Sequence, residues 1–197
     1  MTLRRGFKTE ANHIAREVRE ELGLRWSDPL DPWSLARFLE IPVMPLSQLS
    51  NAAPEAVRHF HRVERGAFSA VTVFDGSHRV IVYNDAHARG RRESDLAHEL
   101  AHALLLHRPG AALDDLGCRR WNSEQEEEAT WLAAVLLVSD EAALQIAREG
   151  KAIDEAATQY NVSERMMKFR LNVTAAFRRA GTIPGSHSPT RRANRSS

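Results

Sequence analysis

Two histidines and a glutamate stand at a spacing that suits metal chemistry, in the pattern H-E-x-x-H formed by His98, Glu99 and His102. On a helix, residues four apart lie on one face, so His98 and His102 can offer imidazole nitrogens to a single metal ion. Glu99 lies next to that face, where it can take a proton from a water that the ion has acidified. The pattern predicts metal-assisted hydrolysis.

The residues around this pattern predict a buried helix over 94–107. The other positions from Leu96 to Leu106 are apolar nearly all round, and Arg108-Pro109-Gly110 is a strong stop signal. Imidazole and carboxylate groups inside a core need a partner, which a metal ion would provide. Two buried histidines with a purely structural role are the alternative, and the apolar context favours the metal.

A third ligand is expected from the acids that open a second apolar helix, over 123–138. Catalytic zinc sites commonly take three protein ligands and keep a water in the fourth position. The candidates share the first turns of that helix: Glu124, Glu126, Glu127 and Glu128. Acids in the first turn also interact favourably with the helix dipole, and Ser123-x-x-Glu126 is itself a capping box. Within this cluster, some acids could therefore bind metal while others stabilise the start of the helix. Zinc is the expected ion, and a set of two histidines and a glutamate also accepts manganese or cobalt.

Hydrophobic periodicity predicts the elements that position these residues. Helices are expected at 9–22, 32–40, 140–149, 153–160 and 164–177, beside the two described above, with an extended segment at 41–46. Two β-branched runs, 67–74 and 77–83, flank Asp75-Gly76 and predict a hairpin. The hairpin would form a sheet floor for the metal helix, and an open edge could pair with an extended peptide substrate.

Three further residues or segments could bind a ligand. In Arg58-His59-Phe60-His61-Arg62, a strand would put both histidines on one face, but a polar strand or loop without a ligand is the preferred interpretation. Cys118, in the loop over 109–122, is expected to be an inert thiol rather than a ligand. His107 is expected to be a cation at the helix end or a donor to a metal ligand rather than a ligand itself.

Composition excludes several classes of protein. The 197 residues are 43% hydrophobic and 27% charged, as in an ordinary soluble globular protein, and the net charge of +1 gives no overall argument for nucleic acid or membrane. No apolar run approaches the roughly 18 residues of a membrane span, and no signal peptide is recognised at the N-terminus. The single cysteine excludes an internal disulfide, and we expect a cytoplasmic protein.

These motifs, taken in order, resemble the ImmA/IrrE family of metallopeptidases. The resemblance is carried by segments that cover roughly residues 10–175: 23–24, 35–43, 80–84, 96–107, 126–137 and 162–171. It implies an α+β fold with a minimal zincin core, and it implies that Glu126 is the third ligand. In gluzincin-like sites the residue four after that glutamate supports a metal histidine, which here is Thr130.

The chain departs from the usual family pattern at a few positions. Thr130 replaces the usual Asn, Ala101 replaces the usual Gly, and Val138-Ser139 replaces Met-Pro. Ala101 is still small enough for close helix approach, and the change at 138–139 affects the helix exit rather than the chemistry.

The sequence therefore predicts a zinc-dependent endopeptidase. His98, His102 and Glu126 would hold the ion, and Glu99 would activate water for attack on a peptide carbonyl. The resemblance implies that the substrate is a helix-turn-helix transcriptional repressor, cut in response to stress or mobile-element signals. The alternative is a regulatory or antitoxin-like module that binds DNA or a repressor, with a structural metal.

Three regions are expected along the chain. Residues 1–140 would form the zincin-like metallopeptidase domain, residues 141–180 a helical region, and residues 181–197 a disordered basic tail. The helices at 153–177 resemble a helix-turn-helix, whose polar face carries Arg165, Lys168, Arg170 and Asn172. Packing of this pair beside the core is preferred over direct nucleic-acid binding, given the weak net charge.

Overall fold

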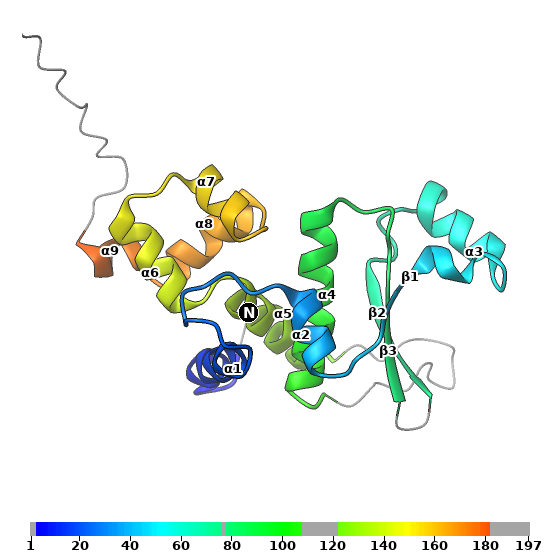
Figure 1. Cartoon of the computed structure of the whole chain (residues 1–197), viewed down its shortest axis with the longest axis horizontal. Coiled ribbons are helices and arrows are strands. Elements are labelled where there is room, and N and C mark those ends of the chain that lie inside the picture. The colour runs from blue at the N-terminus through cyan, green and yellow to red at the C-terminus, as the bar shows by residue number, and fades with distance from the viewer. Residues whose placement is uncertain (1–2, 76–77, 108–121, 182–197) are drawn as a thin grey trace, which may run out of the picture.

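Among the described residues, a small sheet, three helices of 15 or 16 residues and a group of shorter helices make up the fold (Figure 1). The computed structural model describes residues 3–75, 78–107 and 122–181. Its elements in order are α1 (Phe7–Glu21), α2 (Pro32–Phe38), β1 (Val43–Pro45), the 3-10 helix η1 (Leu46–Ser50), α3 (Pro54–Arg58), the π-helical turn η2 (His59–Val63), β2 (Ala70–Asp75), β3 (His78–Tyr83), α4 (Arg89–Leu104), α5 (Ser123–Leu137), α6 (Asp140–Glu149), α7 (Ile153–Gln159), α8 (Glu164–Val173) and α9 (Ala176–Ala180). The predicted α+β class is confirmed.

The sheet separates two hydrophobic cores. Its strand order is β1-β3-β2, with β1 parallel and β2 antiparallel to β3. Thr72 pairs with Ile81, so both side chains lie on one face of the sheet, and Ile81 is fully buried in the main core. Val71 and Val82 lie on the opposite face, in a second cluster. The two predicted hairpin strands are confirmed, while the turn residues 76–77 lie outside the described part of the chain.

Helix α4 lies between the sheet and α5 in the main core. A stripe at helical spacing is fully buried, made of Leu96, Ala97, Leu100 and Ala101. Helix α5 packs against α4 and is buried over nearly its whole second half, from Trp131 to Leu137. The sheet therefore does form the predicted floor beneath the helix that carries His98 and His102.

Two buried arginines form hydrogen bonds to carbonyl groups at the C-terminal end of α5. The Arg19 guanidinium donates to the carbonyl oxygen of Leu136 at 2.7 Å, and Arg170 donates to the carbonyl oxygen of Val138 at 2.7 Å. These carbonyls have no partner inside the helix, so the arginines supply the missing donors. Burial lowers the pKa of Arg19 to about 10, which leaves the group charged near neutral pH.

Several helix ends are explained by the local sequence. The Asp31 carboxylate caps α2 by accepting from the backbone N–H groups of Trp33 and Ser34. Gly23 and Gly150 follow α1 and α6 in the left-handed conformation, with φ of 70° and 61°. The predicted capping box at Ser123 is wrong, because the side chain of the preceding Asn122 caps α5 instead.

The interpretation of residues 58–62 as a strand or loop is wrong. His59 and His61 lie in the π-helical turn η2, which continues directly from α3. Val57 and Phe60 pack with Val82 in the second hydrophobic cluster, so these turns cover the face of the sheet that is turned away from α4 (Figure 1). The two histidines have separate partners, since His61 contacts Asp85 at 3.1 Å and His59 contacts Glu64 at 3.4 Å.

The single helix predicted over 164–177 is also wrong. Helix α8 ends at Val173, and Ala175 adopts a left-handed φ of 51° before the short α9 begins. The Thr174 hydroxyl donates to the Arg170 carbonyl at 2.8 Å, a side-chain bond that competes with continuation of the helix. Arg170 itself is buried against Val138 and Asp140, so it does not belong to an exposed polar face.

The remaining expectations about organisation concern membranes and domains. In the described part of the chain, no single helix is long and apolar enough to cross a membrane. Helices α5 and α6 have that length and apolar content only when they are taken together, and a 46° bend separates them. The division at residue 140 stays a prediction, although buried residues from both sides of it join one core. Cys118 and residues 182–197 lie outside the described residues.

Candidate metal centre

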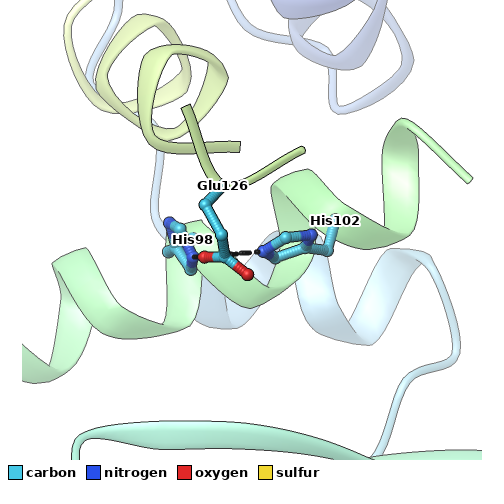
Figure 2. A group of neighbouring side chains, drawn as sticks. All are labelled: His98, His102 and Glu126. Carbon is cyan, nitrogen blue, oxygen red and sulfur yellow. Dashed lines mark hydrogen bonds and ion pairs between the residues drawn. The ribbon is translucent and has the colours of Figure 1, made fainter. Parts of the chain in front are cut away.

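Three side chains from α4 and α5 converge on one point (Figure 2). The Nε2 atoms of His98 and His102 lie 3.1 Å apart. The Glu126 carboxylate oxygen Oε2 lies 3.1 Å from the first of these nitrogens and 3.6 Å from the second. The two histidines are one helical turn apart on α4, and Glu126 lies one turn inside α5, after the cap at Asn122.

This donor set fits a tetrahedral metal ion. Zinc is bound at about 2.0–2.1 Å by imidazole nitrogen and carboxylate oxygen, so tetrahedral ligands lie roughly 3.3 Å from one another. The three observed separations bracket that distance. The side chains of His98, His102 and Glu126 keep 27%, 21% and 26% of their surface exposed, so the group is only partly buried.

The local environment keeps His102 in the form that binds metal. Burial, together with the neighbouring His98 ring, lowers the pKa of His102 to about 4. The imidazole is therefore neutral near pH 7, with a free electron pair for an ion.

Glu99 lies beside this group and faces the sheet. Its Oε2 atom accepts a hydrogen bond of 2.6 Å from the hydroxyl of Thr72, on β2. A short bond from a hydroxyl to a carboxylate is one of the stronger kinds and restricts the rotation of the carboxylate. Thr72 thus fixes one oxygen of Glu99 and leaves the other to act on a water or substrate.

The other acids and Thr130 do not join the three donors. Glu124 is exposed at the start of α5, while the Glu128 carboxylate lies against His107 and Arg4. Thr130 is exposed, and within the described residues it makes no hydrogen bond to His98 or His102. The support of a metal histidine that was expected from Thr130 is therefore not observed.

His107 approaches His102 from just beyond the end of α4. Their Nδ1 atoms lie 2.9 Å apart, and the His107 Nε2 atom lies 3.4 Å from the Glu128 carboxylate. Burial lowers the pKa of His107, although the nearby Glu128 opposes this shift. A contact between His107 and a metal-binding histidine was one of the two expectations from the sequence, but its geometry depends on where the helix ends.

The comparison with protein families agrees with this geometry. Residues 44–172, more than half of the chain, match the IrrE N-terminal-like domain of the M78 peptidases. The chain belongs to this family. The resemblance to the ImmA/IrrE metallopeptidases is confirmed, and at the level of the M78 family the function is of the metallopeptidase type. The chain matches no curated protein and no solved structure at a significant level.

The matched region contains every candidate side chain described above except Arg4. It begins inside β1 and ends in α8, so it takes in the sheet, α4 and α5. Membership in a metallopeptidase family implies a bound metal, and His98, His102 and Glu126 form a group of donors that fits one.

Proposed function

We propose that this M78 family member is a zinc-dependent endopeptidase in which His98, His102 and Glu126 bind the ion and Glu99 is the general base. The observation that carries the proposal is the convergence of three metal-binding atoms from two helices, with Glu99 next to them in the chain. Zinc is preferred because two imidazoles and one carboxylate with room for a water are the donors of many zinc peptidases.

The side chains have separate tasks in peptide hydrolysis. When bound, zinc supplies a Lewis acid that acidifies water and polarises a peptide carbonyl. Glu99 takes a proton from the attacking water and delivers it to the nitrogen of the leaving amine. Thr72 holds the Glu99 carboxylate in place through its 2.6 Å hydrogen bond, so the base needs no reorientation during the reaction.

The sheet offers a way to bind an extended substrate. Among the described strands, β2 pairs only with β3, so within the described residues no strand pairs with its outer edge. Val73 and Phe74 on this strand are exposed large apolar residues. A peptide that adds to this edge as a further strand would run next to Thr72, and therefore next to Glu99.

The proposed substrate is a helix-turn-helix transcriptional repressor, whose cleavage would relieve repression in stress or mobile-element regulation. Its support is the family resemblance, and the chain's fold is compatible with it. The residues 153–177 would then pack beside the catalytic core or help to recognise the repressor.

The proposal is tested by searching for new protein N-termini in cells that express the wild-type chain, Glu99→Gln or Glu124→Gln. Glu124 is an exposed acid at the start of α5, so Glu124→Gln is the matched control. We expect the same new N-termini with wild type and Glu124→Gln, and none with Glu99→Gln, although that variant keeps its metal. If Glu99→Gln behaves like wild type in cells, the chain acts without catalysis, as a regulatory module with a structural metal.

A further inference from the structure

The end of α4 folds back on itself and carries His107 over the metal-binding face. The Leu106 N–H donates to the Ala103 carbonyl at 3.1 Å, and the His107 N–H donates to the His102 carbonyl at 3.0 Å. Together these bonds form a Schellman motif, in which Leu106 takes the left-handed position with φ of 52°. The backbones of His102 and His107 are therefore joined directly, which sets the distance between their rings.

The two rings and an acid from α5 form a continuous chain of contacts. The Nδ1 atoms of His102 and His107 lie 2.9 Å apart, and the ring centroids lie 5.0 Å apart. On its other side, the His107 ring faces Glu128, with 3.4 Å between Nε2 and Oε2. Glu128 accepts a hydrogen bond of 2.6 Å from Arg4. The side chains of His107 and Glu128 are only 9% and 13% exposed, so the contact between these two residues is largely shielded from water.

The distances determine where the ring hydrogens lie. The His102 Nε2 atom belongs to the donor group with His98 and Glu126, so its electron pair is the one available to an ion and its hydrogen lies on Nδ1. That hydrogen points to the His107 Nδ1 atom, which must then accept. The hydrogen of His107 consequently lies on Nε2, where it faces the Glu128 carboxylate. No other arrangement of two neutral rings pairs all these atoms.

We propose that His107 is a positioning residue that orients the metal ligand His102, with Glu128 and Arg4 holding His107 in turn. This inference rests on the metal site of the proposed function. Histidines that bind metal commonly donate their second ring hydrogen to an acceptor that fixes the ring, and loss of this acceptor weakens metal binding about 10- to 100-fold. Here the acceptor is a second imidazole rather than a carboxylate or carbonyl.

The choice of variants separates orientation from packing. His107→Phe keeps an aromatic ring but removes the acceptor. His107→Asn loses the ring but keeps an oxygen, Oδ1, at the same distance from the backbone as Nδ1, so it can still accept from His102. Leu106→Gly is the matched control, because it changes the same turn at a side chain that is 80% exposed and touches neither ring contact.

The test measures zinc and cobalt affinity of the full chain by competition with a chromophoric chelator. The free energy of unfolding of each metal-free variant, measured in urea, checks that it is folded. We expect His107→Phe to bind about 10- to 100-fold more weakly, and His107→Asn and Leu106→Gly to stay near wild type. If His107→Phe binds zinc as tightly as wild type, or if His107→Asn is as weak as His107→Phe, the inference is overturned.

A second readout does not depend on any variant. Nitrogen-15 spectra of the histidine rings in the zinc-loaded chain should show His102 protonated on Nδ1 and His107 on Nε2. A His107 ring protonated on Nδ1 would overturn the inference even if zinc binds well. A wild-type chain that binds no zinc would instead overturn the proposed function, on which the inference rests.

Discussion

Replacing Thr72 by valine should slow catalysis without weakening the binding of metal or substrate. The substitution keeps the shape and the β-branching of the side chain, which suit its place in β2, but removes the hydroxyl that donates to Glu99 at 2.6 Å. Thr72 is not among the donors that surround the metal position. Among the described hydrogen bonds of the Thr72 side chain, the substitution therefore removes only the one to Glu99.

The size of the effect follows from this bond. A hydrogen bond to a charged group contributes about 1.5–3 kcal/mol, and each 1.4 kcal/mol corresponds to about a tenfold change in rate. Because part of this energy is regained from water that replaces the hydroxyl, we expect Thr72→Val to lower kcat about tenfold with little change in KM. The assay is steady-state cleavage of a quenched fluorescent peptide that spans a cleavage site found in cells.

Thr72→Ser provides the control, because it keeps the hydroxyl while losing a methyl group. It should restore most of the activity that Thr72→Val loses, and both variants should bind zinc as wild type does. Equal kcat for Thr72→Val and wild type would refute the reasoning. A Thr72→Ser variant as slow as Thr72→Val would show that packing, and not the hydrogen bond, is responsible.

Three further predictions concern stability. Arg19→Ala should lower the free energy of unfolding, measured in urea, by about 3 kcal/mol. The buried guanidinium donates to three carbonyl groups, each bond contributing about 2 kcal/mol, and the burial that lowers its pKa to about 10 offsets roughly 3 kcal/mol of this. Arg25→Ala, at an exposed arginine, should change little. Leu106→Gly should leave this free energy unchanged or raise it by up to about 1 kcal/mol, since it relieves a left-handed φ at a non-glycine residue; a clear loss of stability in the same titration would contradict this. The metal-free chain should lose stability as the pH falls from about 6.5 towards 4. In the unfolded chain His102 takes up a proton at its ordinary pKa of 6.5, but in the folded chain only near 4. Urea titrations in the presence of a chelator, at several pH values, should show a weaker pH dependence for His102→Asn than for wild type.

Much of the framework around the site could be predicted from local sequence signals. Asp31 before Pro32, Gly23 and Gly150 mark helix ends through backbone chemistry that acts within a few residues. The β-branched runs on either side of Asp75-Gly76 likewise favour two paired strands through local preferences. The i, i+4 spacing of His98 and His102 is a property of any helix, so their shared face follows from spacing alone.

The contacts that the sequence did not predict depend on tertiary structure or on an unusual backbone. The left-handed residue that ends α4 is Leu106, whereas the stop signal recognised in the sequence lies beyond it at Arg108-Pro109-Gly110. The sequence therefore indicated that His107 could contact a metal ligand, but not the geometry of its contact with His102. Thr72 lies in an apolar strand, and only the register against Ile81 shows that it faces α4. Residues 54–63 form a segment too short to be recognised as helical from its hydrophobic periodicity. Its helical turns depend on packing against the sheet.

The proposed function depends on whether His98, His102 and Glu126 bind one divalent ion. The direct measurement is the metal content of the chain purified without a histidine tag, by mass spectrometry, for wild type, His98→Ala, Glu126→Gln and the control Glu124→Gln. We predict one zinc ion per chain in wild type and Glu124→Gln, and loss of most of that zinc in His98→Ala and Glu126→Gln. A zinc content that is unaffected by His98→Ala and Glu126→Gln, or a wild-type chain that holds no divalent metal even after incubation with zinc, would contradict the account.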